Sequence, residues 1–337
     1  MSESVSPPIG LGGYRYPTGW SCVAWSDELE PGQVRKLHYF GQDLVLFRGE
    51  SGQAYALDPH CLHLGAHLGV GGRVEGDRIV CPWHNWRWNG DGSHGFIPYS
   101  RERCKPGLRI HSFPLREWYG MILLWHDRHR RAPHWEPPPV PEAESDAYYP
   151  LHPHSRMVHR IKAHPQLIVE NAADPFHIGP IHHGSPTETT SFRTQGHHLH
   201  ATIATVYGVG KERTWLTPDG PTRSEITYDT YGLGLGFVRF PKSAVETVQI
   251  TSHTPVDEAF TDYWFMQCSV REPGDAGDEP QGRARRFLAL QQQVVQQDFP
   301  IWEHMKVMAE PNFAPEEAPD YRALREWARG FYPPAEL

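Results

Sequence analysis

Several features that would direct a chain to a membrane or to a nucleic acid are missing from these 337 residues. No apolar run approaches the roughly 18 residues of a membrane-spanning helix. The first ten residues, MSESVSPPIG, lack the basic start and apolar core of a signal peptide. Lys and Arg number 32 against 40 Asp and Glu, so the net charge of −8 does not indicate a nucleic-acid partner. We therefore expect a soluble, cytoplasmic protein.

Two further absences concern redox chemistry. The chain has only five cysteines, an odd number. We expect those outside any metal site, Cys22, Cys104 and Cys268, to be free thiols in a reducing compartment. No G-x-G-x-x-G follows a strand-like run, so we expect no nicotinamide cofactor bound in a Rossmann unit. Any electrons that the chain needs must then come from another protein.

What the sequence does contain is two short motifs that pair cysteine with histidine. The first is C-L-H, with Cys61 and His63, and the second is C-P-W-H, with Cys81 and His84. These ligands fit either a closed tetrahedral zinc site or a Rieske [2Fe–2S] centre, in which two His replace two Cys on one iron. Zinc motifs usually pair like with like, whereas each motif here offers one thiolate and one imidazole. Glycines crowd the neighbouring loops, where close approach to bridging sulfides needs residues without a Cβ. The pattern favours the iron–sulfur cluster.

The rest of the chain is organised around a run of prolines. Short strand-like runs between turn signals predict a small all-β domain over residues 15–132, which includes both Cys–His motifs. The prolines predict an extended linker over residues 133–156. Residues 157–337 form the second predicted domain, with a larger antiparallel sheet between about 197 and 266 and a helix over 283–308, where apolar residues recur at three- and four-residue steps. The predicted fold class is α+β.

A second set of metal ligands is expected in the second domain. His177 and His182 enclose four residues, and two His with one carboxylate form the facial triad of non-haem Fe(II) oxygenases. This spacing alone is weak in a chain with 22 histidines. However, an electron-transfer centre earlier in the chain needs a centre that receives its electrons. His183 and His164 are rival ligands on spacing.

Asp298 is the candidate carboxylate. It falls on the apolar stripe of the predicted C-terminal helix, and a buried carboxylate is usually paired or metal-bound because burying it unpaired costs several kcal/mol. An aspartate that caps a helix restarted after the kink at Pro300 fits the pattern equally well.

Together these motifs resemble the terminal oxygenase components of Rieske non-haem iron oxygenases. The family pattern N-x-x-D-x-x-H-x-x-x-x-H is met by Asn171, Asp174, His177 and His182, and C-x-H…C-x-x-H is met by the two motifs above. The resemblance covers nearly the whole chain. The stretches H-L-G-A-H-L-G-V-G-G (63–72), C-P-W-H-N-W-R-W-N-G-D-G (81–92) and D-F-P-I-W-E-H (298–304) are most similar to 3-ketosteroid 9α-hydroxylases and, more distantly, to sterol 7-desaturases.

The resemblance implies a Rieske [2Fe–2S] cluster held by the two Cys–His motifs and a mononuclear Fe(II) held by His177, His182 and Asp298. It implies a helix-grip-like catalytic domain with an antiparallel sheet and a C-terminal helix. Asp174 would bridge a cluster histidine of one subunit to an iron-ligating histidine of the next in a homotrimer, and Asn171 would be a further catalytic residue. A separate NAD(P)H-dependent reductase, with or without a ferredoxin, would supply electrons.

The expected reaction uses O2 to hydroxylate an apolar multi-ring substrate such as a 3-ketosteroid. Five aromatic residues are candidates for the pocket lining: Phe176, Tyr231, Phe237, Phe240 and Trp264. Desaturation, hydroxylation or oxidative demethylation of another substrate, such as a sterol, an alkaloid or an aromatic compound, is the alternative. A Rieske electron-transfer protein without its own catalytic iron is a third hypothesis, and the second domain argues against it.

Overall fold

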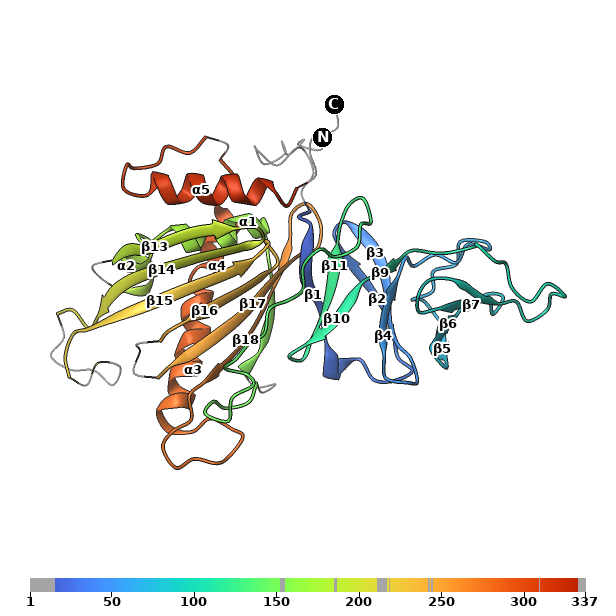
Figure 1. The fold of residues 1–337 in the computed structure, drawn as a ribbon, viewed down its shortest axis with the longest axis horizontal. Coiled ribbons are helices and arrows are strands. Elements are labelled where there is room, and N and C mark those ends of the chain that lie inside the picture. Colours follow the sequence, from blue (N-terminus) through green and yellow to red (C-terminus); the bar gives the residue numbers. More distant parts are fainter. Residues whose placement is uncertain are drawn as a thin grey trace. The chain divides into compact units, whose positions relative to one another are not determined.

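The computed structural model of the chain describes residues 16–151, 155–184, 187–210, 217, 219–241, 243, 245–308 and 310–332 (Figure 1). Residue 15 and residues 152–154 and 333–337, which the predicted domain bounds include, lie outside the described residues. The described chain divides into two compact units. One holds residues 20–134 with 255–258, and the other holds 16–19, 135–254 and 259–332.

The first unit is built from short strands in three small sheets. The first sheet has the order β1 (Gly19–Trp25), β11 (Met121–His126), β10 (Leu115–Trp118). The second has the order β2 (Val34–Tyr39), β3 (Gln42–Arg48), β4 (Ala54–Leu57), β9 (Ser112–Phe113), and the third runs β5 (Arg73–Glu75), β6 (Arg78–Val80), β7 (Arg87–Asn89), β8 (His94–Phe96). The only helical segment assigned among its described residues is the 3-10 turn η1 (Ser26–Glu28). The unit is therefore all-β, as predicted.

The core of this unit explains why the Cys–His motifs occupy fixed positions. Phe47, Leu57, Leu68, Ile79 and Trp88 pack into one cluster of buried side chains that also contains Cys61 and Cys81. Burying apolar side chains is the main stabilising contribution to such a domain. Because both cysteines belong to the core, the two loops that carry them are anchored at their first residue.

The second unit is organised by a seven-stranded sheet with the order β12-β18-β17-β16-β15-β14-β13. The strands are β12 (Met157–Ile161), β13 (Thr187–Gln195), β14 (His198–Tyr207), β15 (Thr222–Tyr231), β16 (Leu235–Arg239), β17 (Thr247–Pro255) and β18 (Thr261–Ser269). The pairs from β13 to β17 and the pair β12–β18 are antiparallel. A large antiparallel sheet with few helices agrees with the predicted class.

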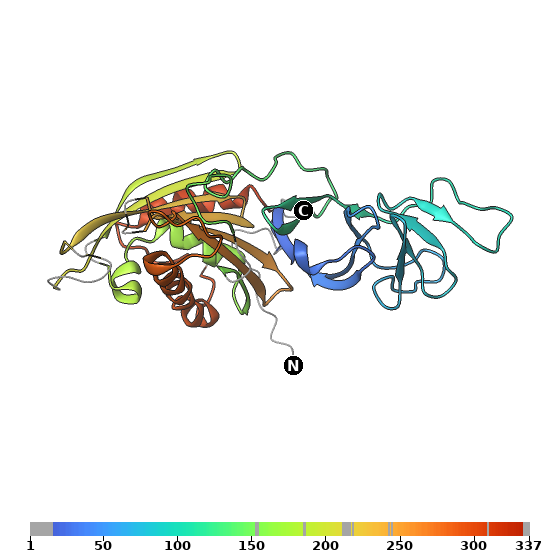
Figure 2. The same ribbon diagram turned by 90° about the horizontal axis from the view of Figure 1, so that it is seen from below.

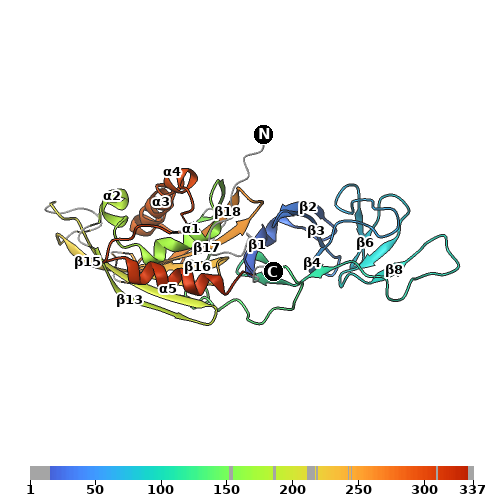
Figure 3. The same ribbon diagram turned by 90° about the horizontal axis from the view of Figure 1, so that it is seen from above.

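Helices cover one face of this sheet. They are α1 (Pro165–Val169), η3 (Glu170–Ala173), α2 (Ile178–His182), α3 (Gly282–Gln296), α4 (Phe299–His304) and α5 (Ala318–Arg329). Leu199 and Ala201 of β14 pack with residues of α1 and α5, and Ile203 packs with Ile178 of α2. Side chains two residues apart on a strand share a face, so these helices lie on the same side. Figures 2 and 3 show α3 along one side of the strands.

One prediction about an element needs correction. The helix predicted over 283–308 is two helices, because α3 ends at Gln296 and α4 begins at Phe299 with Pro300 in its first turn. Proline lacks the N–H that a continuous helix needs, and the chain leaves helical geometry after His304. In the Pro-rich stretch 133–156, Trp135, Val140 and Tyr149 are buried in the second unit.

None of the helices in the described part of the chain is long and apolar enough to cross a membrane.

Candidate metal centres

The two Cys–His motifs lie in loops of the same construction. In residues 61–66, the N–H of Cys61 donates to the carbonyl of Ala66 at 2.9 Å and the N–H of Gly65 donates back to Cys61 at 2.9 Å. In residues 81–86, Cys81 bonds to Trp86 at 2.8 Å and Asn85 bonds back to Cys81 at 3.1 Å. Gly65 and Asn85 occupy the same position in each loop, and both have positive φ, 79° and 58°. Glycine and asparagine tolerate that conformation best.

The four side chains converge at one point between these loops. The thiols of Cys61 and Cys81 share a hydrogen bond, which raises the pKa of Cys61 and lowers that of Cys81. The rings of His63 and His84 lie 4.5 Å apart, centroid to centroid, and His63 stacks on Trp86 at 4.6 Å. Trp88 Nε1 donates to Cys61 Sγ at 3.4 Å. The structure thus brings all four predicted ligands together.

His63 provides a direct test of whether these residues suit a metal cluster. Its Nδ1 is buried, and within the described residues it has no hydrogen-bond partner. A buried polar atom without a partner is costly, by about 1–3 kcal/mol, and a metal ion on that nitrogen would remove the cost. Two adjacent thiols that share a proton are likewise suited to a soft metal, which displaces the protons and binds both sulfurs as thiolates. The donor set fits a Rieske cluster.

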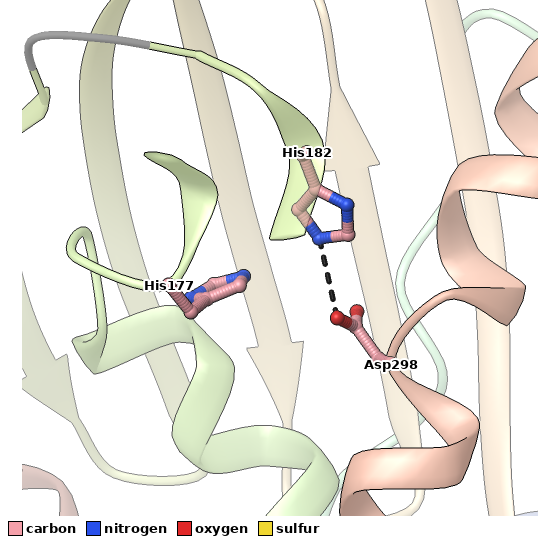
Figure 4. A group of neighbouring side chains, drawn as sticks. All are labelled: His177, His182 and Asp298. Carbon is pink, nitrogen blue, oxygen red and sulfur yellow. Dashed lines mark ion pairs between the residues drawn. The ribbon is translucent and has the colours of Figure 1, made fainter. Parts of the chain in front are cut away.

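The second group of candidate ligands is His177, His182 and Asp298. One ligand atom from each lies within 4.8 Å of the others. Figure 4 shows the two histidines on the α2 segment pointing toward Asp298, which precedes α4, and His182 Nε2 lies 3.2 Å from Asp298 Oδ1. Burial lowers the pKa of His182, but Asp298 and Gln297 outweigh burial and raise it. The group therefore attracts positive charge.

Hydrogen bonds fix the ring orientation of the two histidines. His177 Nδ1 lies 2.6 Å from the backbone carbonyl of Asp174, and His182 Nδ1 lies 3.0 Å from Gln297 Oε1. Carbonyl oxygens only accept, so each Nδ1 carries a proton and Nε2 is the ring nitrogen left to face the ligand group. This is the tautomer that an Nε2-ligating histidine needs, and partners of this kind orient metal ligands. The arrangement fits a divalent iron held by two His and one carboxylate.

Asp298 is oriented by a chain of two neutral donors. Trp302 Nε1 donates to Asn171 Oδ1 at 3.4 Å, which fixes the orientation of that amide. Asn171 Nδ2 then donates to Asp298 Oδ2 at 3.3 Å. Asp298 Oδ1 is left facing His182. The predicted residue Asn171 thus contacts the carboxylate directly.

The remaining predicted residues of this region have different surroundings. Asp174 Oδ1 accepts from the N–H groups of Phe176 and His177 at 2.9 and 3.2 Å. Burial raises the pKa of Asp174, but His177 and these N–H groups outweigh burial and lower it. The rival His183 lies outside the ligand group, with a left-handed φ of 61° after α2. His164 caps α1 by accepting from Gln166 N at 3.2 Å.

Two parts of the chain match known protein families. Residues 19–114 match the Rieske [2Fe-2S] domain, and residues 124–332, more than half of the chain, match the 3-ketosteroid 9alpha-hydroxylase C-terminal domain. This chain belongs to the 3-ketosteroid 9α-hydroxylase family of Rieske non-haem iron monooxygenases. The oxygenase accordingly uses a Rieske [2Fe–2S] cluster and a mononuclear iron.

Two 3-ketosteroid monooxygenase components match this oxygenase over most of their length, and a cholesterol desaturase matches it over a shorter part. A 3-ketosteroid-9-alpha-monooxygenase oxygenase component of Rhodococcus rhodochrous is 29% identical over 94% of this chain and 82% of its own length. A second relative from that organism, named as a probable 3-ketosteroid-9-alpha-monooxygenase oxygenase component, is 30% identical over 96% of this chain and 82% of its own length. Cholesterol 7-desaturase nvd of Bombyx mori is 38% identical, but over 55% of this chain and 38% of its own length. The crystal structure of apo dicamba monooxygenase has a TM-score of 0.68 at 17% identity, covering 94% of this chain and 98% of that one, and shows the same fold.

A cavity of about 520 Å³ adjoins the second ligand group of the oxygenase. His177, His182 and Asp298 form part of its wall. The other walls come from α1, α2, α3 and the helix-covered face of β15–β18, and they are largely apolar. A largely apolar pocket with a few polar groups beside a metal centre is the usual form of a small-molecule site.

Strand alternation decides which of the five predicted pocket residues reach this cavity. Phe240 lines it and packs with Ile178 and Ile226. Phe237 borders it, but its ring contacts Tyr231 and Arg239 instead.

The other three predicted pocket residues are not among the described residues that line the cavity. Thr230 and Tyr263 line the cavity, so Tyr231 and Trp264, one position further, face away from it. Phe176 is 45% exposed.

Three features of this region were not predicted. Gln297 and Trp302 support the ligands, and a second group of His198, His200 and Asp229 gathers on the other face of the sheet. The spacing H-x-H in a strand signals that His198 and His200 share a face. Their contact with Asp229 depends on the β14–β15 register, in which Asp229 pairs with His200. A single sequence does not give that register.

Proposed function

We propose that this chain is the oxygenase component of a 3-ketosteroid 9α-hydroxylase system. It would use O2 and electrons from a separate NAD(P)H-dependent reductase, with or without a ferredoxin, to hydroxylate an apolar multi-ring substrate. The observation that supports this most is the largely apolar cavity of about 520 Å³ with His177, His182 and Asp298 in its wall. The names of the relatives from Rhodococcus rhodochrous supply the substrate class.

In this proposal, Cys61, His63, Cys81 and His84 hold the cluster, and His177, His182 and Asp298 hold the mononuclear iron. When bound, these groups supply one-electron transfer and a ferrous centre with open coordination positions. Asn171 and Gln297 keep the carboxylate and the imidazole in orientation, which is worth about 10–100-fold in metal affinity for such partners. The apolar walls around Phe240 position the substrate and exclude bulk water.

Asp174 is proposed to link the two centres between subunits of a homotrimer. Its carboxylate is anchored by two backbone N–H groups, and Oδ2 lies 3.5 Å from His177 Nδ1. Large apolar side chains in and beside the Cys–His loops are exposed: Leu62 at 50%, Leu64 at 71%, Trp83 at 71% and Tyr99 at 62%. Apolar side chains grouped in this way mark surfaces that other chains cover. Sedimentation should give about three times the chain mass of 38.5 kDa, and a monomer would contradict the trimer.

The test of function is turnover with a defined steroid. The purified chain, loaded with iron and sulfide, is incubated with a reductase, NADH and 4-androstene-3,17-dione. We expect a hydroxylated steroid and steroid-stimulated O2 uptake, both absent in His177→Ala. No hydroxylated product together with no stimulation of O2 uptake would exclude the proposed substrate.

A second candidate is desaturation of a sterol, which the partial match to cholesterol 7-desaturase favours. The same assay with cholesterol distinguishes the two, because desaturation removes two hydrogens without adding oxygen to the product. A dehydrogenated sterol and an unchanged steroid would replace the first proposal with the second.

A further inference from the structure

Two buried glutamines interrupt the apolar wall of the cavity. Gln249 on β17 is 4% exposed and Gln291 on α3 is 7% exposed, and both line the cavity. Gln291 lies on the buried stripe of α3 with Ala284, Phe287 and Leu288, where the helix periodicity calls for an apolar residue. An amide at such a position is unfavourable unless its polar atoms have partners.

The two amides satisfy each other only in part. Gln249 Nε2 donates to Gln291 Oε1 at 2.9 Å. Within the described residues, Gln249 Oε1 and Gln291 Nε2 have no further hydrogen bond. Neither is among the fully buried polar atoms without a partner, so both keep some open surface. If both amides were turned over, the pair would still leave one NH2 group and one carbonyl oxygen for a ligand.

We propose that the Gln249–Gln291 pair recognises the 3-ketone oxygen, at the end of the substrate that lies far from the proposed iron ligands. This inference rests on the proposed function and specifies which part of the steroid is read. Gln291 lies in the last two turns of α3, which ends at Gln296, and Asp298 follows that end by two residues; both residues line the cavity. An elongated ligand held at Gln291 by its ketone therefore extends toward the proposed iron ligands.

Gln267 serves as a matched control, because it is a buried amide outside the cavity. It is also a buried glutamine facing α3, and its Nε2 donates to the carbonyl of Leu288 at 2.7 Å. It is not among the residues that line the cavity. Removing this amide should not change which ligand is preferred.

The experiment compares binding of two steroids that differ only in the ketone. Equilibrium dialysis of the holoprotein measures the Kd of 4-androstene-3,17-dione and of 4-androsten-17-one, which lacks the 3-ketone. The variants are Gln249→Leu/Gln291→Leu and Gln267→Leu. Replacing both members of a pair avoids leaving one amide unsatisfied. The cluster absorption spectrum serves as a check that each variant is folded.

We expect wild type and Gln267→Leu to prefer the 3-ketone by at least about tenfold, the ratio given by one lost hydrogen bond to a buried donor. The double variant should bind both steroids with similar Kd. If the folded double variant keeps the preference, or loses affinity equally for both steroids, the inference is wrong. If wild type binds neither steroid, the proposed substrate class fails and the inference fails with it.

Discussion

The second unit contains two groups of two histidines and one aspartate, and they differ in how the aspartate is neutralised. In His177–His182–Asp298, Oδ2 of the carboxylate accepts from the neutral amide of Asn171 at 3.3 Å. In His198–His200–Asp229, Oδ2 is 3.0 Å from Arg239 Nη1, and Oδ1 accepts from both imidazoles at 2.8 and 2.9 Å. Arg239 also pairs with Glu142. In the second group, a guanidinium thus already occupies one side of the carboxylate, where the first group has only a neutral amide.

The histidines of the two groups also differ in the partners of their ring nitrogens. His177 and His182 use Nδ1 for carbonyl oxygens, so Nε2 is the ring nitrogen on the side of the ligand group, that of His182 at 3.2 Å from Asp298 Oδ1. His198 and His200 each direct a ring nitrogen at the carboxylate itself, and His198 also stacks on Tyr231 at 4.6 Å. The first group lines the cavity, whereas Asp229 lies between two cavity-lining residues of its strand and faces away. Residue type and spacing alone therefore do not identify a metal site; the partners of each ligand do.

The largest expected difference between the two groups is in iron content when one histidine of each is replaced. His177→Ala should lower the iron content from about three atoms per chain, two in the cluster and one mononuclear, to about two, and turnover should disappear. Elemental analysis and the visible spectrum of the cluster measure this. His200→Ala is the control and should keep all the iron. Equal iron loss in both variants would remove the distinction between the groups.

A large but purely functional effect is expected from Asp174→Asn. The amide keeps an oxygen for the backbone N–H groups of Phe176 and His177, so the fold and both metals should persist. Turnover should fall by at least about 100-fold because the proposed link between the centres loses its charge. Stopped-flow reoxidation of the reduced cluster provides the readout. Wild-type turnover in this variant would contradict the proposed role.

A smaller effect should follow when a ligand loses its supporting partner. Gln297→Leu removes the acceptor of His182 Nδ1–H, and the affinity for iron should fall by about 10–100-fold. Thr202→Val is the counterpart in the other group, because Thr202 Oγ1 lies 3.3 Å from His200 Nε2. Titration with Fe(II) or Co(II) should show no change in that control. An unchanged affinity in Gln297→Leu would mean that this contact does not support the metal ligand.

The smallest effect concerns stability alone. Burial raises the pKa of Asp229, but His198, His200 and Arg239 outweigh burial and lower it from 3.8 to about 2. A depressed folded-state pKa stabilises the protein above the unfolded pKa, and this contribution is lost as the pH falls from about 4 toward 2. Asp229→Asn should lower the free energy of unfolding by roughly 2 kcal/mol at pH 7 and by less in acid. Urea unfolding measures it, and iron content and turnover should stay unchanged.

The fold class and the grouping of candidate ligands could be predicted because their signals are local. The Cys–His motifs and the His177–His182 spacing each lie within a few residues. Asp298 is the candidate carboxylate on a predicted helix stripe, but the structure places it at the N-cap of α4, the alternative that the sequence leaves open. The pocket could not be predicted in the same way. Whether Tyr231 or Thr230 faces the cavity depends on which face of the sheet the helices cover. The contacts of Asn171 with Asp298 and Trp302 join segments more than a hundred residues apart.

The most direct test of the account is the metal content of the purified, anaerobically reconstituted chain, measured together with the low-temperature paramagnetic resonance of its reduced form. The account predicts about three irons and two acid-labile sulfides per chain, with the signal of a cluster ligated by two histidines. Only two irons, or zinc without labile sulfide, would contradict it.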